Sequence, residues 1–267
     1  MNRSQIRKAI GQAAIVAACL AAAPGAALAQ QAAAKPVPAG EIEPKAIDAL
    51  KTMGAYLRTL KTFTVRSDTT IDEVLDTGQK VQFGGTVEYR VRAPNRLRAE
   101  VNSDRKQRQY FYDGKTMTVY GPRNKYYASV PASGSIGELV QAAEQKHGLD
   151  LPLSDLFLWG TDKAGLDDIK SAIYVGPARV AGIDTDHYAY RQQDVDWQLW
   201  IERGKTPLPR KMVITTTQEA SQPQYVALLK WDLASKLDDA VFKFVPPKDA
   251  KRIAVAGAEA QAAAAKK

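Results

Sequence analysis

The feature that most constrains the fold is a long succession of segments in which apolar and polar residues alternate. The alternation begins at residue 62 and returns until residue 234, and a period of two is typical of half-buried β-strands. Asp113-Gly114 lies between two such segments and is typical of a tight hairpin turn. The alternation predicts strands at 62–75, 81–91, 97–101, 107–112, 115–120, 125–130, 173–180, 185–191, 196–202, 211–219 and 225–234. The Gly84-Gly85 pair within the second strand predicts a bulge or a bend.

Two segments break this pattern and are expected to be helical. Pro44 stands at a favoured first-turn position, and apolar residues then recur at helical spacing at Ile47, Leu50, Met53, Leu57 and Leu60, which predicts a helix over 44–60. Ser135 and Glu138 form a capping-box pattern, which predicts a second helix ending near Gly148. The apolar stretch 151–159, LPLSDLFLW, is expected to be a further short helix.

These elements together predict an α+β fold built on one sheet. Consecutive strands with short connections favour a large curved antiparallel sheet of about ten or eleven strands, an open half-barrel. A sheet of this size curls, and its inner face needs a cover. The N-terminal helix and the short helical insertion are the available covers. Some late strands are apolar on both faces, so we expect an apolar hollow between the sheet and the helices.

The first 29 residues resemble an export signal. Basic residues precede an apolar run, and Ala27-Leu28-Ala29 stands before Gln30, which indicates cleavage between Ala29 and Gln30. The run is too short and too rich in Ala for a stable membrane anchor. A second interpretation remains open, because Val16-Ala17-Ala18-Cys19 is close to a bacterial lipobox, in which Cys19 would be lipidated. The sequence thus predicts a periplasmic protein, or alternatively a lipoprotein attached to the outer membrane.

Composition limits what the rest of the chain can do. Residues 30–43 are expected to be a flexible Ala/Pro-rich linker and 254–267 a disordered Ala-rich tail, which leaves one domain at 44–253. The net charge is +8, or +5 without the three basic residues of 1–29, and these charges are not clustered as a nucleic-acid-binding surface requires. Cys19 is the only cysteine, so the domain has no disulfide and no thiolate metal site.

The residue patterns indicate no enzyme. The two histidines are His147, at the expected end of a helix where it suits the dipole, and His187. Asp184-x-Asp186-His187 resembles a metal corner, but alternation places Asp186 and His187 on opposite faces of a strand. No phosphate loop, dinucleotide fingerprint or zinc spacing is present. We therefore expect no catalytic residue, no metal and no cofactor.

Several short motifs occur in a fixed order along the chain. They are Tyr112-Asp113-Gly114-Lys115 with the hairpin through Tyr127, Pro152-Leu153-Ser154-Asp155-Leu156-Phe157, Val175-Gly176-x-x-x-Val180-x-Gly182, Trp197-Gln198-Leu199-Trp200-Ile201 with Pro207-Leu208-Pro209-Arg210-Lys211, and Phe242-x-Phe244-x-Pro246-Pro247. In this order they resemble the DUF2092 family of predicted periplasmic proteins, in the LolA-like superfamily. The resemblance implies a half-open barrel around an apolar cavity, which holds acyl chains in characterised relatives. It also implies a basic residue near the cavity mouth, for which Arg66 is a candidate.

These observations predict an exported, non-enzymatic protein that binds a lipid, an acyl chain or a lipopeptide. It would act as a carrier or chaperone in the cell envelope, as a monomer. Envelope or membrane proteins are possible partners and nucleic acid is not. The alternatives are an envelope scaffold or assembly factor whose hollow is merely core, and the anchored lipoprotein. The segment 151–159 is the expected lid or plug, and the candidate cavity or lid residues are Leu153, Leu156, Phe157, Trp159, Trp197 and Trp231.

Overall fold

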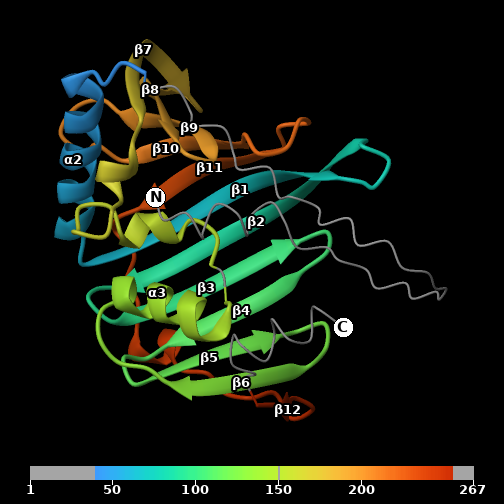
Figure 1. Ribbon diagram of the computed structural model, residues 1–267. Coiled ribbons are helices and arrows are strands. Elements are labelled where there is room, and N and C mark those ends of the chain that lie inside the picture. The colour runs from blue at the N-terminus through green and yellow to red at the C-terminus, as the bar shows by residue number, and fades with distance from the viewer. Residues whose placement is uncertain (1–39, 150, 255–267) are drawn as a thin grey trace.

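One twelve-stranded sheet runs through the protein (Figure 1). The computed structural model describes residues 40–149 and 151–254. The strands are β1 (Thr62–Val74), β2 (Lys80–Arg92), β3 (Arg96–Ser103), β4 (Gln107–Tyr112), β5 (Thr116–Gly121), β6 (Tyr126–Pro131), β7 (Ser171–Val180), β8 (Ile183–Gln192), β9 (Val195–Glu202), β10 (Pro209–Thr216), β11 (Gln224–Asp232) and β12 (Lys251–Arg252). Their spatial order is β12-β6-β5-β4-β3-β2-β1-β11-β10-β9-β8-β7.

The sheet consists of two antiparallel meanders joined side by side. Strands β1 to β6 form the first meander and β7 to β11 the second, and the antiparallel pairing of β1 with β11 connects them. The α+β class and the large open antiparallel sheet are therefore confirmed. The count is twelve rather than ten or eleven, because β12 contributes two residues that pair parallel with β6. A strand of two residues is too short to show alternation.

The Gly84-Gly85 pair is not a bulge. The register of β1 with β2 runs without a shift from Thr62↔Arg92 to Val74↔Lys80, and both glycines are paired within it. Register shifts occur instead between Tyr174 and Gly176 in β7 and between Pro209 and Lys211 in β10. The two glycines lie where the pairing of β3 with β2 ends, and the backbone N–H of Gly84 donates to Asp104 Oδ2 at 2.9 Å.

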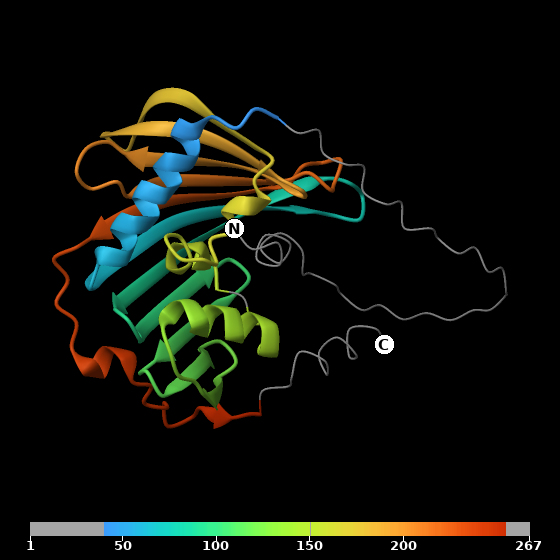
Figure 2. The same cartoon turned by 60° about the vertical axis from the view of Figure 1, so that its left-hand side comes forward.

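The helices cover one face of the sheet, here called the inner face. Helix α2 (Pro44–Thr59) lies over the second meander and α3 (Ile136–His147) over the first (Figure 2). Both helices were predicted from the sequence. The Ser135–Glu138 capping box starts α3, and Gly148 ends it in the left-handed conformation with φ 59°. The buried stripe of α2 contains Leu50, Met53 and Leu57, which provide part of the core.

Chain segments at both ends of the domain attach to the sheet. Ile42 forms a parallel bridge with Ala172 of β7, so pairing with the sheet begins before Pro44. After β11 the chain crosses to the opposite, outer face through the 3-10 helix η3 (Asp239–Phe242). There Phe244 packs its ring 5.2 Å from Phe111 and 5.0 Å from Tyr127, which covers part of the outer face of the first meander.

Some expectations fall on residues outside the described ranges. The signal peptide 1–29, its cleavage site at Ala29 and Gln30, the lipidation candidate Cys19, most of the linker and the tail from residue 255 onwards belong to this group. Within 40–149 and 151–254, no helix combines the length and the apolar character needed to cross a membrane.

Candidate ligand-binding site

A short irregular segment fills the middle of the inner face, between α2 and α3. This segment, residues 151–160, is named the plug. Its only regular structure is the 3-10 helix η1 (Ser154–Phe157), which is shorter than the helix expected there. The plug is nevertheless buried as predicted: Leu153, Leu156, Phe157 and Trp159 are each less than 10% exposed. It fills the middle of the space that the sequence predicted between sheet and helices.

Polar contacts attach the plug to the sheet and to α2. The hydroxyl of Tyr89, on β2, donates to the carbonyl oxygen of Pro152. Arg58, near the end of α2, donates from Nη1 to the carbonyl oxygen of Phe157 at 3.0 Å and from Nη2 to that of Leu156. Burial lowers the pKa of the Arg58 guanidinium. These bonds satisfy carbonyl groups that η1 is too short to satisfy itself.

Backbone packing adds a further attachment. Gly54 of α2 lies against Gly160, and a Cβ atom on either residue would overlap the backbone of the other. Gly160 also has φ +79°, a conformation that favours glycine. The helix and the end of the plug therefore meet without intervening side chains.

A cavity of about 180 Å³ remains between the plug and the sheet. We name it the inner cavity. Its apolar wall includes Ile71, Val87, Val101, Leu153, Met212 and Ile214. Three of the lining residues at its polar end are Thr69, Thr86 and Lys106, which are half-buried or exposed. An enclosed apolar wall with a polar, more accessible end is the usual layout of a site for an amphiphilic small molecule.

Among the described residues, one carboxyl group borders the inner cavity. Asp155 of η1 is 5% exposed, and its Oδ1 has no hydrogen-bond partner among the described residues. Burial, together with the negative charge of Glu144 on α3, raises the pKa of Asp155 to about 6. A buried carboxyl with an incomplete set of partners costs folding free energy, and such costs are common at binding sites.

Of the predicted cavity and lid residues, Leu153, Leu156 and Trp159 line either the inner cavity or a narrow gap next to it. Leu153 lines the inner cavity, and all three line a second gap beneath the plug that is too narrow for water. Phe157 is instead packed edge-on against Tyr89, with ring centroids 5.2 Å apart.

The other candidate residues lie away from the inner cavity. Trp197 stacks on Tyr190 at 4.1 Å between centroids, and the Trp231 ring packs against Phe63 while its Nε1 donates to the carbonyl of Pro209. Arg66 is exposed on the outer face, because it alternates with Val65 and Ser67, which are buried on the inner face. The expectation that Arg66 contacts a head group at this cavity is therefore corrected. Lys106 is the cation at the polar end.

Sequence reasoning missed most of the residues that surround the cavity. Ile71, Met212 and Ile214 come from β1 and β10, which lie on either side of β11. The alternation on β10 indicates that Met212 and Ile214 share one face. It does not indicate that this face meets Ile71, since that depends on the joining of the two meanders.

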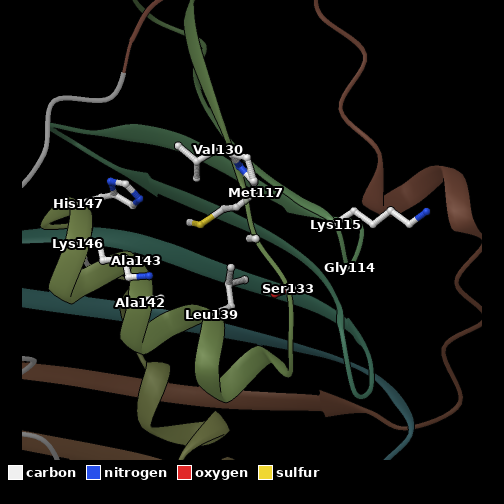
Figure 3. A pocket seen from close by; sticks show the side chains of 12 residues that line it. Gly114, Lys115, Met117, Val130, Ser133, Leu139, Ala142, Ala143, Lys146 and His147 are labelled. Carbon is white, nitrogen blue, oxygen red and sulfur yellow. The ribbon is translucent and has the colours of Figure 1, made fainter.

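A second and larger hollow lies beside α3, on the same face of the sheet. This groove has a volume of about 470 Å³ and runs between α3 and the β5–β6 hairpin (Figure 3). Its apolar wall comes from Met117, Val130, Leu139, Ala142 and Ala143. It shares no lining residue with the inner cavity.

The side chains of Asp184, Asp186 and His187 do not converge to form a metal site. His187 stacks on Trp200 with ring centroids 3.9 Å apart, and its Nε2 lies 3.0 Å from Gln198 Oε1. Asp186 accepts hydrogen bonds from Tyr174 and Arg203. Within the described ranges, no group of three or more His, Cys, Asp or Glu side chains is arranged to hold a metal ion.

Comparison with solved structures finds proteins of similar architecture. An uncharacterized conserved protein from Thermus thermophilus has 12% identity and a TM-score of 0.45, over 79% of this chain and 99% of that one. The lipoprotein LppX from Mycobacterium tuberculosis has 14% identity and a TM-score of 0.46, over 73% and 100%. A LolA superfamily protein from Nitrosomonas europaea has 9% identity and a TM-score of 0.35, over 74% and 97%. No protein with a curated description matches the chain.

The sequence also matches one protein family over nearly the whole folded domain. The family model is that of DUF2092, described as a predicted periplasmic protein, and it covers residues 46–256. This match confirms the family resemblance found in the ordered motifs, and its description agrees with the expected periplasmic location. The chain belongs to the DUF2092 family of predicted periplasmic proteins.

Proposed function

We propose that this protein binds the acyl chain of a lipid or lipopeptide in the inner cavity, as a non-enzymatic carrier or chaperone of the cell envelope. The observation that supports the proposal is the apolar cavity between plug and sheet, with its polar end at Lys106. Each methylene group transferred from water into such a cavity contributes about 0.8 kcal/mol. Lys106 would attract a negatively charged or polar head group at the open end.

The size of the cavity implies that the plug moves when a ligand binds. Pockets for drug-sized ligands usually measure about 300–1,000 Å³, whereas the inner cavity measures about 180 Å³. A long acyl chain therefore needs additional room, and the apolar side chains of the plug occupy the adjacent space. The plug lies directly against the cavity and has little regular structure, so it is the covering element that would have to shift.

The proposal is tested with a fluorescent fatty acid, 11-(dansylamino)undecanoic acid, titrated into the purified protein. Ile71→Trp places a large ring in the cavity from a half-buried position on β1. We expect the wild type to bind the probe and Ile71→Trp to bind it at least about tenfold more weakly, equivalent to about 1.4 kcal/mol. Native mass spectrometry of protein isolated from its own periplasm should also show a bound lipid.

Leu228→Trp is the matched control, because Leu228 is 39% exposed and lies on the outer face of β11. This variant should bind the probe as the wild type does. Protein that carries no lipid from the periplasm and does not take up the probe would refute the proposal. Cross-linking to an envelope protein would then favour the scaffold function.

A further inference from the structure

The groove beside α3 has a charge pattern that the inner cavity lacks. Lys146 and His147 stand at the end of α3, and Lys115 lies at the other side of the groove, where its side chain extends away from the hollow (Figure 3). Both lysines are exposed, and neither forms an ion pair with a carboxylate in the described part of the chain. Among residues 40–149 and 151–254, no Asp or Glu side chain lines the groove. The ammonium groups are therefore available to a ligand, because no described carboxylate is paired with them.

The volume of the groove indicates a small molecule rather than a folded partner. Its roughly 470 Å³ falls within the 300–1,000 Å³ typical of small-molecule sites. The wall offers aliphatic carbon and one thioether, that of Met117, whose unbranched chain adapts to irregular ligands. His147 adds a polar atom, because its Nδ1 is buried and has no hydrogen-bond partner among the described residues.

We infer that this groove is a second binding site, for a single-chain amphiphile with an anionic head group. The chain lies along Met117, Val130, Leu139 and Ala142, and the head group is held by Lys146. The proposal goes beyond the acyl-binding function of the inner cavity, because the two hollows have no lining residue in common. A cationic amphiphile of the same chain length lacks the attraction and is rejected.

The test is a calorimetric titration with two probes of equal chain length, both kept below their critical micelle concentrations. Laurate is anionic and dodecyltrimethylammonium is cationic. We expect laurate to bind at least about tenfold more tightly, and the difference to shrink in 1 M salt, where the Debye length is about 3 Å. Acetate, which has the charge without the chain, should show no measurable binding.

Two variants locate the site. Ala142→Trp fills the groove from a half-buried position on α3, and Gln145→Trp is its control, since Gln145 is exposed on the same helix and lies outside the groove. The variant Lys146→Glu reverses the charge. Its control, Lys51→Glu, makes the same change at an exposed position elsewhere. In the Ile71→Trp background, where the inner cavity is filled, each groove variant should weaken laurate binding at least tenfold, and the controls should not.

The titrations are repeated in the Ile71→Trp background, which separates this proposal from the first. Laurate binding that survives Ile71→Trp and is lost in Ala142→Trp supports the groove as an independent site. Equal binding of the two probes, or laurate binding that neither groove variant weakens, overturns it. A loss of laurate binding in Ile71→Trp alone would place all binding in the inner cavity and would also overturn it.

Discussion

Asp155 is a buried side chain whose chemistry differs from its ordinary state. Its burial within the plug and its proximity to Glu144 raise its pKa from 3.8 to about 6. The folded protein therefore holds this proton at pH values where the unfolded chain has released it. Between about pH 4 and pH 6 the folded state binds more protons than the unfolded state, so this group lowers stability as the pH rises.

The prediction at this scale concerns Asp155→Asn, which keeps the shape and removes the charge. We expect the variant to unfold like the wild type at pH 4. At pH 7 it should be more stable by up to about 3 kcal/mol, the equivalent of a shift of roughly two pKa units. Urea denaturation across this pH range measures the difference. Asp162→Asn changes an exposed carboxyl and should leave the pH dependence unaltered. A stability gain for Asp155→Asn that is the same at pH 4 and pH 7 would contradict this prediction.

At the scale of elements, the contact between α2 and the plug depends on two facing glycines. From the sequence alone, Gly54 is expected to destabilise its helix, since glycine costs up to about 1 kcal/mol relative to alanine there. The structure explains its presence, because a Cβ at residue 54 would overlap the backbone of Gly160. Backbone cannot move aside as a flexible side chain can.

Gly54→Ala is therefore expected to destabilise the protein despite its better helix propensity. Overpacking of this kind costs about 1–3 kcal/mol, and the net loss measured by urea denaturation should be about 1–2 kcal/mol. Gly84→Ala is the control, because the nearest neighbouring atom, Asp104 Oδ2, lies 3.9 Å from the added Cβ. If Gly54→Ala were as stable as the wild type, the close packing of helix and plug would not exist in solution.

At the scale of the whole molecule, the sheet is held together by strand pairing, and the plug is a separate cover that packs onto it. Strand pairing connects both meanders through β1 and β11, whereas the plug is held by its buried apolar side chains, by Arg58 and Tyr89, and by the glycine contact. Weakening the plug should therefore change ligand entry more than it changes the sheet.

Arg58→Ala tests this separation. The loss of two hydrogen bonds from a charged donor costs about 1–3 kcal/mol, and it favours states in which the plug is open. We expect the dansyl fatty acid to enter at least about fivefold faster in stopped-flow fluorescence, with a lower unfolding midpoint. Arg179→Ala removes an arginine that is 71% exposed and should alter neither property. An entry rate that stays unchanged while stability falls would show that the plug is not the barrier.

Local patterns determined much of the fold in advance. The positions of the strands, both helices and the Ser135–Glu138 capping box follow from alternation, helical spacing and short-range hydrogen bonding, all of which act over a few residues. The sequence also predicts that Arg66 lies on the outer face, because it alternates with Val65 and Ser67 along β1. The expectation of a head-group contact came from family resemblance rather than from this alternation.

The binding hollows were decided by tertiary structure. Ile71, Leu153 and Ile214 are far apart in the sequence and meet only because β1 pairs with β11 and the plug folds back between the helices. No local preference encodes that pairing, which depends on the free energy of burying whole faces of the sheet. The sequence by itself determined the strands, their faces and the apolar plug. Only the folded chain decided which parts of the predicted hollow remain open, because this depends on how side chains from distant segments fill a shared volume.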